Sequence, residues 1–235
     1  MTVILPDPDL TALSRAQLLT MQAAGVEARR CMSALDKVGY NLVGEVLKGQ
    51  GQFVRLEHYP KGDVYDRDSH SQYYYHAHRD GEHGHFHCFL RAAGMPDGVA
   101  PVPEARTRDW PKGDKALAHL VAISMDRFGK PLRMFTTNQW VTGETWYPAP
   151  DVLRMIDRFS VDHAFPSWPT NLWLTAMFRL FRPQITALIA ARDTAFAAHA
   201  KTLQTDPFDD RGFETITECA INLDTQIAAV DAALG

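Results

Sequence analysis

The pattern of hydrophobic and polar positions divides the chain into three parts. Residues 14–47 carry an intermittent apolar stripe at helical spacing, and Ser14-Arg-Ala-Gln17 at its start matches a capping box. Residues 52–140 contain stretches that alternate as strands do, and residues 150–234 return to helical periodicity. We therefore predict a single α+β domain over residues 1–235, with an N-terminal helix at 14–47, a sheet region at 52–140 and a C-terminal helical region at 150–234.

The sheet region is predicted to form a small antiparallel β-sheet of about five strands, packed with several α-helices. Residues 53–59 alternate like a strand, and the polar residues 60–71 after it indicate a loop that could cover the sheet. Asp80-Gly81 predicts the turn of a first hairpin, because a tight type I′ turn needs positive φ at both central residues.

A second hairpin is predicted around Phe128-Gly129. This register pairs Ile123 with Met134 on an apolar face and His119 with Asn138 at its far end. A buried histidine needs a partner, since unpaired polar groups are costly inside a protein. The pair is either a satisfied contact at the sheet margin or part of a functional site, in which Asn138 orients His119 or a substrate.

The C-terminal region is predicted to be helical throughout. Pro150-Asp151 opens one helix, Pro183 starts or kinks another, and the aromatic segment around Trp173 is buried or lines a hydrophobic pocket. The last predicted helix has apolar residues spaced three and four apart, namely Phe213, Ile216, Ala220, Leu223, Ile227, Val230 and Leu234. Such a stripe packs against one neighbouring helix, within the chain or across a homodimer.

Composition and charge narrow the possible partners. The 235 residues carry a net charge of −4, and no block of lysine or arginine occurs, so we expect no nucleic-acid partner. The N-terminus lacks the basic start and long apolar run of a signal peptide, and no apolar stretch approaches membrane-spanning length. The three widely spaced cysteines suit a reducing compartment. We expect a cytoplasmic protein that acts on a small molecule and has no membrane partner.

Five of the ten histidines fall between positions 76 and 87. The Asp80-Gly81 register opposes His76 with His85, and side chains alternate along a strand, so the histidines share one face. Neutral imidazole is the commonest protein metal ligand. The predicted ligands are two residues of the first strand, two of the second and one of a neighbouring strand: His76, His78, His85, His87 and His119. His83 lies nearest the turn in this register and is therefore the weakest ligand candidate. The same register turns Glu82 away from the histidines.

Alternatives to this site are open at the level of sequence. The histidines could form a solvated outer face, and a binuclear site is possible. Three nearby carboxylates, Asp63, Asp66 and Asp68, do not match the EF-hand spacing, although Asp66 or Asp68 could complete a mixed site. Whether the site includes other histidines is open for His58, His70 and His163.

The ligand types suggest which metal and which chemistry to expect. An imidazole site without thiolates fits a divalent transition metal, with iron expected first and copper, manganese or zinc as alternatives. We predict a metal-dependent oxidoreductase, a mononuclear non-haem iron oxygenase or oxidase, with Tyr74 as a proton or hydrogen-atom donor. A zinc-dependent hydrolase or lyase on the same ligands is the second hypothesis, and a non-catalytic metal-binding or sensor protein is the third.

Two resemblances bear on the histidine-rich segment. His76-x-His78-x-x-x-Glu82 resembles the core of the first cupin motif, in which two histidines and a glutamate bind a divalent metal in a small β-barrel. The flanking glycines and the second motif of the cupins are missing, so we do not expect a cupin barrel. The longer string from Tyr73 to His78, followed by His83 to His87, is similar to that of an uncharacterised bacterial family, which implies no activity.

Overall fold

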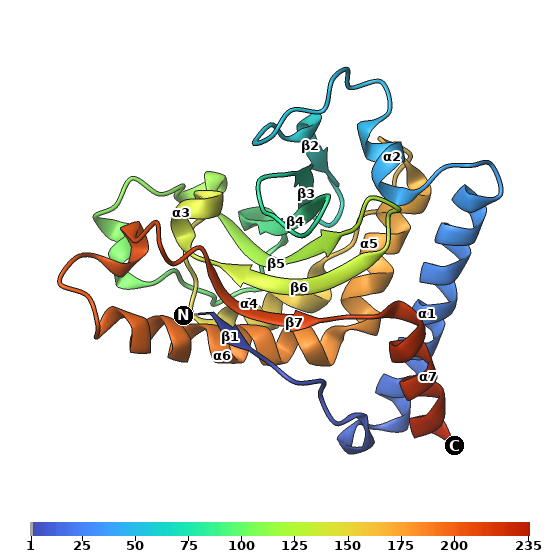
Figure 1. The fold of residues 1–235 in the computed structure, drawn as a ribbon. Helices are drawn as coiled ribbons and strands as arrows, with labels where there is room; N and C mark the ends of the chain where they lie inside the picture. Colours follow the sequence, from blue (N-terminus) through green and yellow to red (C-terminus); the bar gives the residue numbers. More distant parts are fainter. Residues whose placement is uncertain (1) are drawn as a thin grey trace.

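The computed structural model describes residues 2–235, and these residues form one mixed β-sheet with helices packed against it (Figure 1). The strand order is β1-β7-β6-β5-β4-β3-β2. The pairing of β1 with β7 is parallel and the other pairings are antiparallel. The strands are β1 (Val3–Ile4), β2 (Tyr59–Tyr65), β3 (Ser71–His76), β4 (Gly84–Arg91), β5 (Leu117–Met125), β6 (Pro131–Thr137) and β7 (Thr215–Ala220).

Seven α-helices accompany the sheet within the described residues, which confirms the α+β class, whereas the sheet has seven strands instead of about five. The helices are α1 (Arg15–Asp36), α2 (Leu42–Leu47), α3 (Gln139–Thr142), α4 (Ala149–Met155), α5 (Trp168–Leu180), α6 (Arg182–Ala200) and α7 (Leu223–Leu234). The predicted capping box at Ser14 and Gln17 is present, and Pro183 lies at the start of α6 as predicted.

The single N-terminal helix predicted over 14–47 is wrong, because the chain turns between α1 and α2. Gly39 has a φ of +74°, a conformation that a helix interior does not contain. Asn41 then begins α2 by accepting a hydrogen bond from the backbone N–H of Gly44. The strand predicted at 53–59 is also misplaced: β2 begins at Tyr59, where the predicted strand ends, and covers part of the segment predicted as a loop.

The first half of the last predicted helix is a strand in the structure, and only the second half is helical. Residues 215–220 form β7, which fills the position between β1 and β6. The β-branched residues Thr215 and Thr217 favour a strand, and pairing with β6 supplies a ladder of hydrogen bonds that a local pattern cannot reveal. Asn222 caps α7 by accepting from the Thr225 N–H. Helix α7 packs against α1 within the chain.

The register of the first hairpin is confirmed, although its turn is longer than predicted. Tyr74 pairs with His87 and His76 with His85 across β3 and β4. Strand β3 stops at His76 and β4 begins at Gly84, so residues 77–83 form a longer connection instead of a two-residue turn. Because this connection leaves the ladder, its side chains no longer follow strand alternation.

The second hairpin is confirmed only in part. Ile123 pairs with Met134, but an irregularity near the turn then pairs Met125 with Pro131. Asn138 lies beyond the end of β6 and caps α3. The predicted pairing of His119 with Asn138 is therefore wrong, because the β5–β6 ladder ends at Ala122 and Phe135, three positions before His119.

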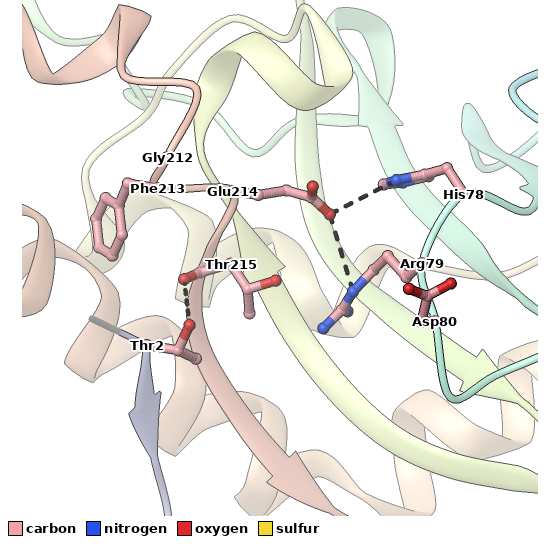
Figure 2. A pocket seen from close by; sticks show the side chains of 8 residues that line it. All are labelled: Thr2, His78, Arg79, Asp80, Gly212, Phe213, Glu214 and Thr215. Carbon is pink, nitrogen blue, oxygen red and sulfur yellow. Dashed lines mark hydrogen bonds and ion pairs between the residues drawn. The ribbon is translucent and has the colours of Figure 1, made fainter.

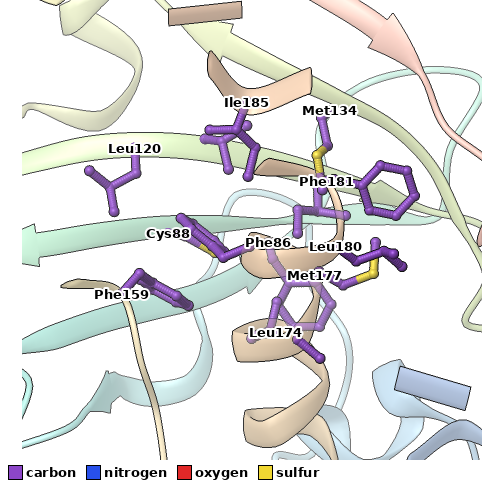
Figure 3. Packing of buried hydrophobic residues seen from close by; sticks show 14 of the residues in the cluster. Phe86, Cys88, Leu120, Met134, Phe159, Leu174, Met177, Leu180, Phe181 and Ile185 are labelled. Carbon is purple, nitrogen blue, oxygen red and sulfur yellow. The ribbon is translucent and has the colours of Figure 1, made fainter. Parts of the chain in front are cut away.

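Helices cover one face of the sheet and leave the histidine-bearing face to loops and neighbouring strands. Figure 1 shows α4, α5 and α6 beneath the sheet, with α1 beside α5. Phe86 and Cys88 of β4 point into this helical layer, where Figure 3 shows Leu174, Met177 and Ile185 around them. Trp173 is fully buried in the same layer, with its ring centroid 6.2 Å from that of Phe86.

Candidate metal centre

Four histidines converge on the face of the sheet opposite the helical layer. The group consists of His76, His78, His85 and His87, each of which offers a ring nitrogen, and these four atoms all lie within 4.8 Å of one another. The Nε2 atoms of His76 and His85 are 2.8 Å apart. His76, His85 and His87 are buried, and His78 is partly exposed. This group can hold a metal ion, as the sequence predicted for these four residues.

Strand pairing brings these side chains together. His76 is the last residue of β3, and His85 lies directly opposite it on β4, with His87 two residues farther along on the same face. His78 comes from the connection after β3. Gly84 permits the close approach at this point, since a Cβ atom there would lie 2.5 Å from the backbone oxygen of His76.

Glu82 orients His85. One carboxylate oxygen of Glu82 contacts Nδ1 of His85, and the other accepts hydrogen bonds from Ser124 Oγ at 2.5 Å and Arg133 Nη2 at 3.3 Å. An ionised carboxylate can only accept, so Nδ1 carries the proton and Nε2 presents its lone pair to the cluster. The prediction that Glu82 turns away from the histidines is wrong, because Glu82 lies in the connection outside the strands.

His119 lies behind the four-histidine group. Its Nε2 is 2.9 Å from Nδ1 of His87, and its Nδ1 is 3.4 Å from Thr137 Oγ1. Among the described residues, Nε2 of His87 is buried and has no hydrogen-bond partner, which fits a nitrogen that serves as a ligand. In this arrangement His119 contacts the ring of His87 and can fix its orientation; the four-nitrogen group does not include His119, whose role as a ligand stays a prediction.

Burial keeps the imidazoles of His76, His85, His87 and His119 neutral. It lowers the pKa of His76 to about 2 and, together with the charge of Arg192, the pKa of His119 to about 3. It also lowers the pKa of His85 and His87. Neutral imidazole is the form that binds metal, so metal binding at His76, His85 and His87 requires no proton release at neutral pH.

Two buried glutamates near the cluster have opposite pKa shifts. Burial raises the pKa of Glu144 to about 8, although its Oε2 accepts the backbone N–H of His119 at 2.6 Å. Burial also opposes ionisation of Glu82, but hydrogen bonds from His85 and Ser124, together with the charge of Arg79, outweigh it and lower the pKa of Glu82 to about 2. Glu82 is therefore the permanent negative charge beside the histidines.

The two predicted catalytic residues lie in different surroundings. The Tyr74 ring stacks on His58 at a centroid distance of 3.6 Å and meets His76 edge-on at 5.2 Å. Burial raises the pKa of Tyr74, so its phenol keeps its proton. The Asn138 side chain accepts from the Gln139 N–H at 2.7 Å and donates to the backbone oxygen of Pro207 at 2.8 Å.

The other candidate residues from the sequence are engaged in other contacts. His58 Nδ1 lies 3.2 Å from Asp63 Oδ1, and the His70 ring contacts Tyr65. Asp66 binds backbone N–H groups, including that of Asp162 at 2.9 Å. His83 stacks on Phe53 at 5.2 Å and approaches the Tyr75 hydroxyl, away from the four-histidine group.

Sequence reasoning missed the supporting shell of Glu82, Ser124, Arg133 and Glu144. The spacing of Glu82 after His76 and His78 was a usable signal for the first of these. The other three come from β5, β6 and the segment after α3, and no local pattern connects them to the histidines.

Comparison with known proteins places the chain in one family. Residues 22–221 match the family described as Domain of unknown function (DUF6969), and the chain belongs to that family. No curated protein and no solved structure matches the chain. The comparison provides no link to the cupins. Among residues 2–235, none of the helices combines the length and apolar character needed to cross a membrane.

Proposed function

We propose that this protein binds one divalent transition-metal ion through His76, His78, His85 and His87 and uses it for redox chemistry on a small molecule. The observation that supports it best is the convergence of four imidazoles within 4.8 Å, one of them backed by an ionised carboxylate. Carboxylate, histidine and metal in series is a recurrent arrangement in metalloproteins, in which the carboxylate fixes the tautomer of the ligand.

The donor set narrows the choice of metal. All four donors are imidazole nitrogens, and the nearest cysteine along β4, Cys88, points to the opposite face of the sheet. Imidazole without thiolate suits iron, copper, manganese or zinc. We expect iron first, because a histidine-bound ferrous ion provides the redox chemistry of an oxygenase or oxidase, and Tyr74 lies beside His76 with a protonated phenol that can donate a hydrogen atom or a proton.

Metal titration of protein purified without a histidine tag tests the binding. Wild type should take up one equivalent of Fe(II) under anaerobic conditions, and His76→Ala and His85→Ala should lose that equivalent while remaining folded. His199→Ala is the matched control, since His199 pairs with Asp210 at 2.7 Å outside the four-histidine group. Uptake that is absent in wild type, or unchanged in both cluster variants, would contradict the proposal.

The chemistry requires a separate measurement. Protein isolated from cells grown with balanced trace metals should contain iron and should consume oxygen with a reductant faster than His85→Ala does. Stoichiometric zinc with no oxygen consumption by the iron-loaded protein would replace the oxidoreductase with the hydrolase or lyase.

A further inference from the structure

A cavity of about 430 Å³ opens beside the four-histidine group, between the connection after β3 and the start of β7. Figure 2 shows His78 at one side of this cavity and Glu214 opposite it. The other lining residues are Thr2, Arg79, Asp80, Gly212, Phe213 and Thr215. His78 belongs both to the cavity wall and to the histidine group, and the other three histidines of the group are at most 5 % exposed. The cavity therefore gives solvent access to the proposed metal through His78.

The positive charge in the cavity wall is already compensated. Arg79 Nη2 lies 3.2 Å from a carboxylate oxygen of Glu218, and Arg79 Nε lies 3.8 Å from Glu214. The guanidinium also stacks over the ring of Phe135, with its carbon 4.3 Å from the ring centroid. Arg79 is thus held by its own neighbours, although its Nη1 is buried and has no hydrogen-bond partner among residues 2–235. Two carboxylates, Glu214 and Asp80, line the cavity beside this one guanidinium, and this excess of negative charge disfavours an anionic ligand.

The negative charge in the wall is less engaged. The Glu214 carboxylate lies 3.8 Å from both His78 Nδ1 and Arg79 Nε, and no residue among 2–235 donates a hydrogen bond to it (Figure 2). Its side chain is 31 % exposed. Asp80 adds a second carboxylate to the same wall. A carboxylate at the edge of a cavity without a donor of its own is suited to accept one from a ligand.

We propose that this cavity is the substrate site and that it takes a small molecule carrying a protonated amine, which donates hydrogen bonds to Glu214 while the rest of the molecule extends past His78. This inference rests on the proposed metal centre. Of the two alternatives predicted for the segment around Trp173, burial is the one observed, since Trp173 lies in the helical layer on the other face of the sheet and lines no part of this cavity.

The test uses two probes of similar size on protein loaded with Co(II), followed by the visible spectrum of the metal. Histamine and imidazole-4-acetate both present an imidazole to the metal, and they differ in the charge of the side arm. Wild type should bind histamine about tenfold more tightly than imidazole-4-acetate, because Glu214 attracts the ammonium group of histamine and repels the carboxylate of imidazole-4-acetate. Glu214→Gln should remove most of that preference, and Glu104→Gln, an exposed change elsewhere, should leave it intact.

Each outcome bears on one of the two proposals. Co(II) bound with unchanged stoichiometry but equal affinity for the two probes, or tighter binding of imidazole-4-acetate, would overturn the amine site and leave the metal centre standing. A preference for histamine that persists in Glu214→Gln would overturn it as well. Failure of wild type to bind Co(II) or Fe(II) would remove the metal centre, and the amine site would fall with it.

Discussion

At the residue scale, the centre depends on how single hydrogen bonds set the direction of lone pairs. Glu82 holds the proton of His85 on Nδ1, and His119 occupies Nδ1 of His87. In both histidines the Nε2 lone pair is then free to bind a metal ion in the four-histidine group. The histidines alone would form a cluster with several tautomers, and these neighbours select the tautomers that can bind metal.

Replacing Glu82 with Gln should weaken metal binding about 10- to 100-fold, because the His85 hydrogen bond loses its charge and the ligand becomes less basic. The metal stoichiometry should stay at one. Competition against a chelator of known affinity measures the change, with His199→Ala as the reference. An affinity equal to that of wild type would show that Glu82 supports the fold alone.

Glu144 gives the stability of the protein a defined pH dependence. Its pKa is about 8 in the folded state against an ordinary value of 4.5, so the folded protein retains a proton that the unfolded chain has released. Its contribution to stability is therefore fully present below about pH 4.5 and is lost as the pH rises toward 8. Glu144→Gln keeps an acceptor for the His119 N–H and removes the titration.

Urea unfolding of wild type and Glu144→Gln at pH 5, 6.5 and 8 checks this expectation. The free energy of unfolding of the variant, minus that of wild type, should increase as the pH rises from 5 to 8. Other titrating groups cancel in the difference between the two proteins. A difference that is constant with pH, or that falls, would show that Glu144 is ionised throughout.

At the element scale, the hairpin of β3 and β4 carries the ligands, and the strands beside it provide what holds them. Ser124 of β5 and Arg133 of β6 bind Glu82, and Thr137 of β6 contacts His119. Strand β7 then forms the far wall of the cavity with Thr215. The position of β7 next to β6 consequently matters for the site as well as for the sheet.

Asn222→Ala tests the boundary between β7 and α7. Asn222 caps α7 through its contact with the Thr225 N–H at 2.9 Å, so its loss should cost about 1 kcal/mol of stability. If residues 213–234 formed one helix, Asn222 would lie inside it, and the same change would stabilise the protein by a few tenths of a kcal/mol. The sign of the shift in the urea midpoint distinguishes the two structures.

At the scale of the whole molecule, the sheet separates two environments. One face packs against α4, α5 and α6 and builds the main apolar core, whereas the other buries histidines and charged groups. Burial of so many polar side chains is costly unless each finds a partner. A bound cation would supply partners for several of them at once and would link β3, β4 and the connection between them.

Metal binding should therefore stabilise the whole domain. At a free metal concentration about a hundred times Kd, linkage predicts a gain of about 2.7 kcal/mol in the free energy of unfolding. Thermal unfolding with and without Co(II) should show a rise in Tm for wild type and for His199→Ala, and none for His85→Ala. An equal rise in His85→Ala would place the bound metal elsewhere in the protein.

The sequence by itself determined the features that depend on neighbours along the chain. The capping box at Ser14 and the register that opposes His76 with His85 follow from local hydrogen bonding and strand alternation. Because alternation has a period of two, one correct register was enough to place His76, His85 and His87 on a common face, whereas His78 reaches the group from the connection after β3. The α+β class followed from the same periodicities.

Only the tertiary structure decided the features that depend on partners distant in sequence. Strand β7 formed because β6 and β1 offered it a ladder, and the direction of Glu82 was set by Ser124 and Arg133 from other strands. Likewise, His119 lies behind His87 because the β4 and β5 pairing brings it there. These contacts join residues far apart in the chain, and their free energy becomes available only once the sheet is assembled.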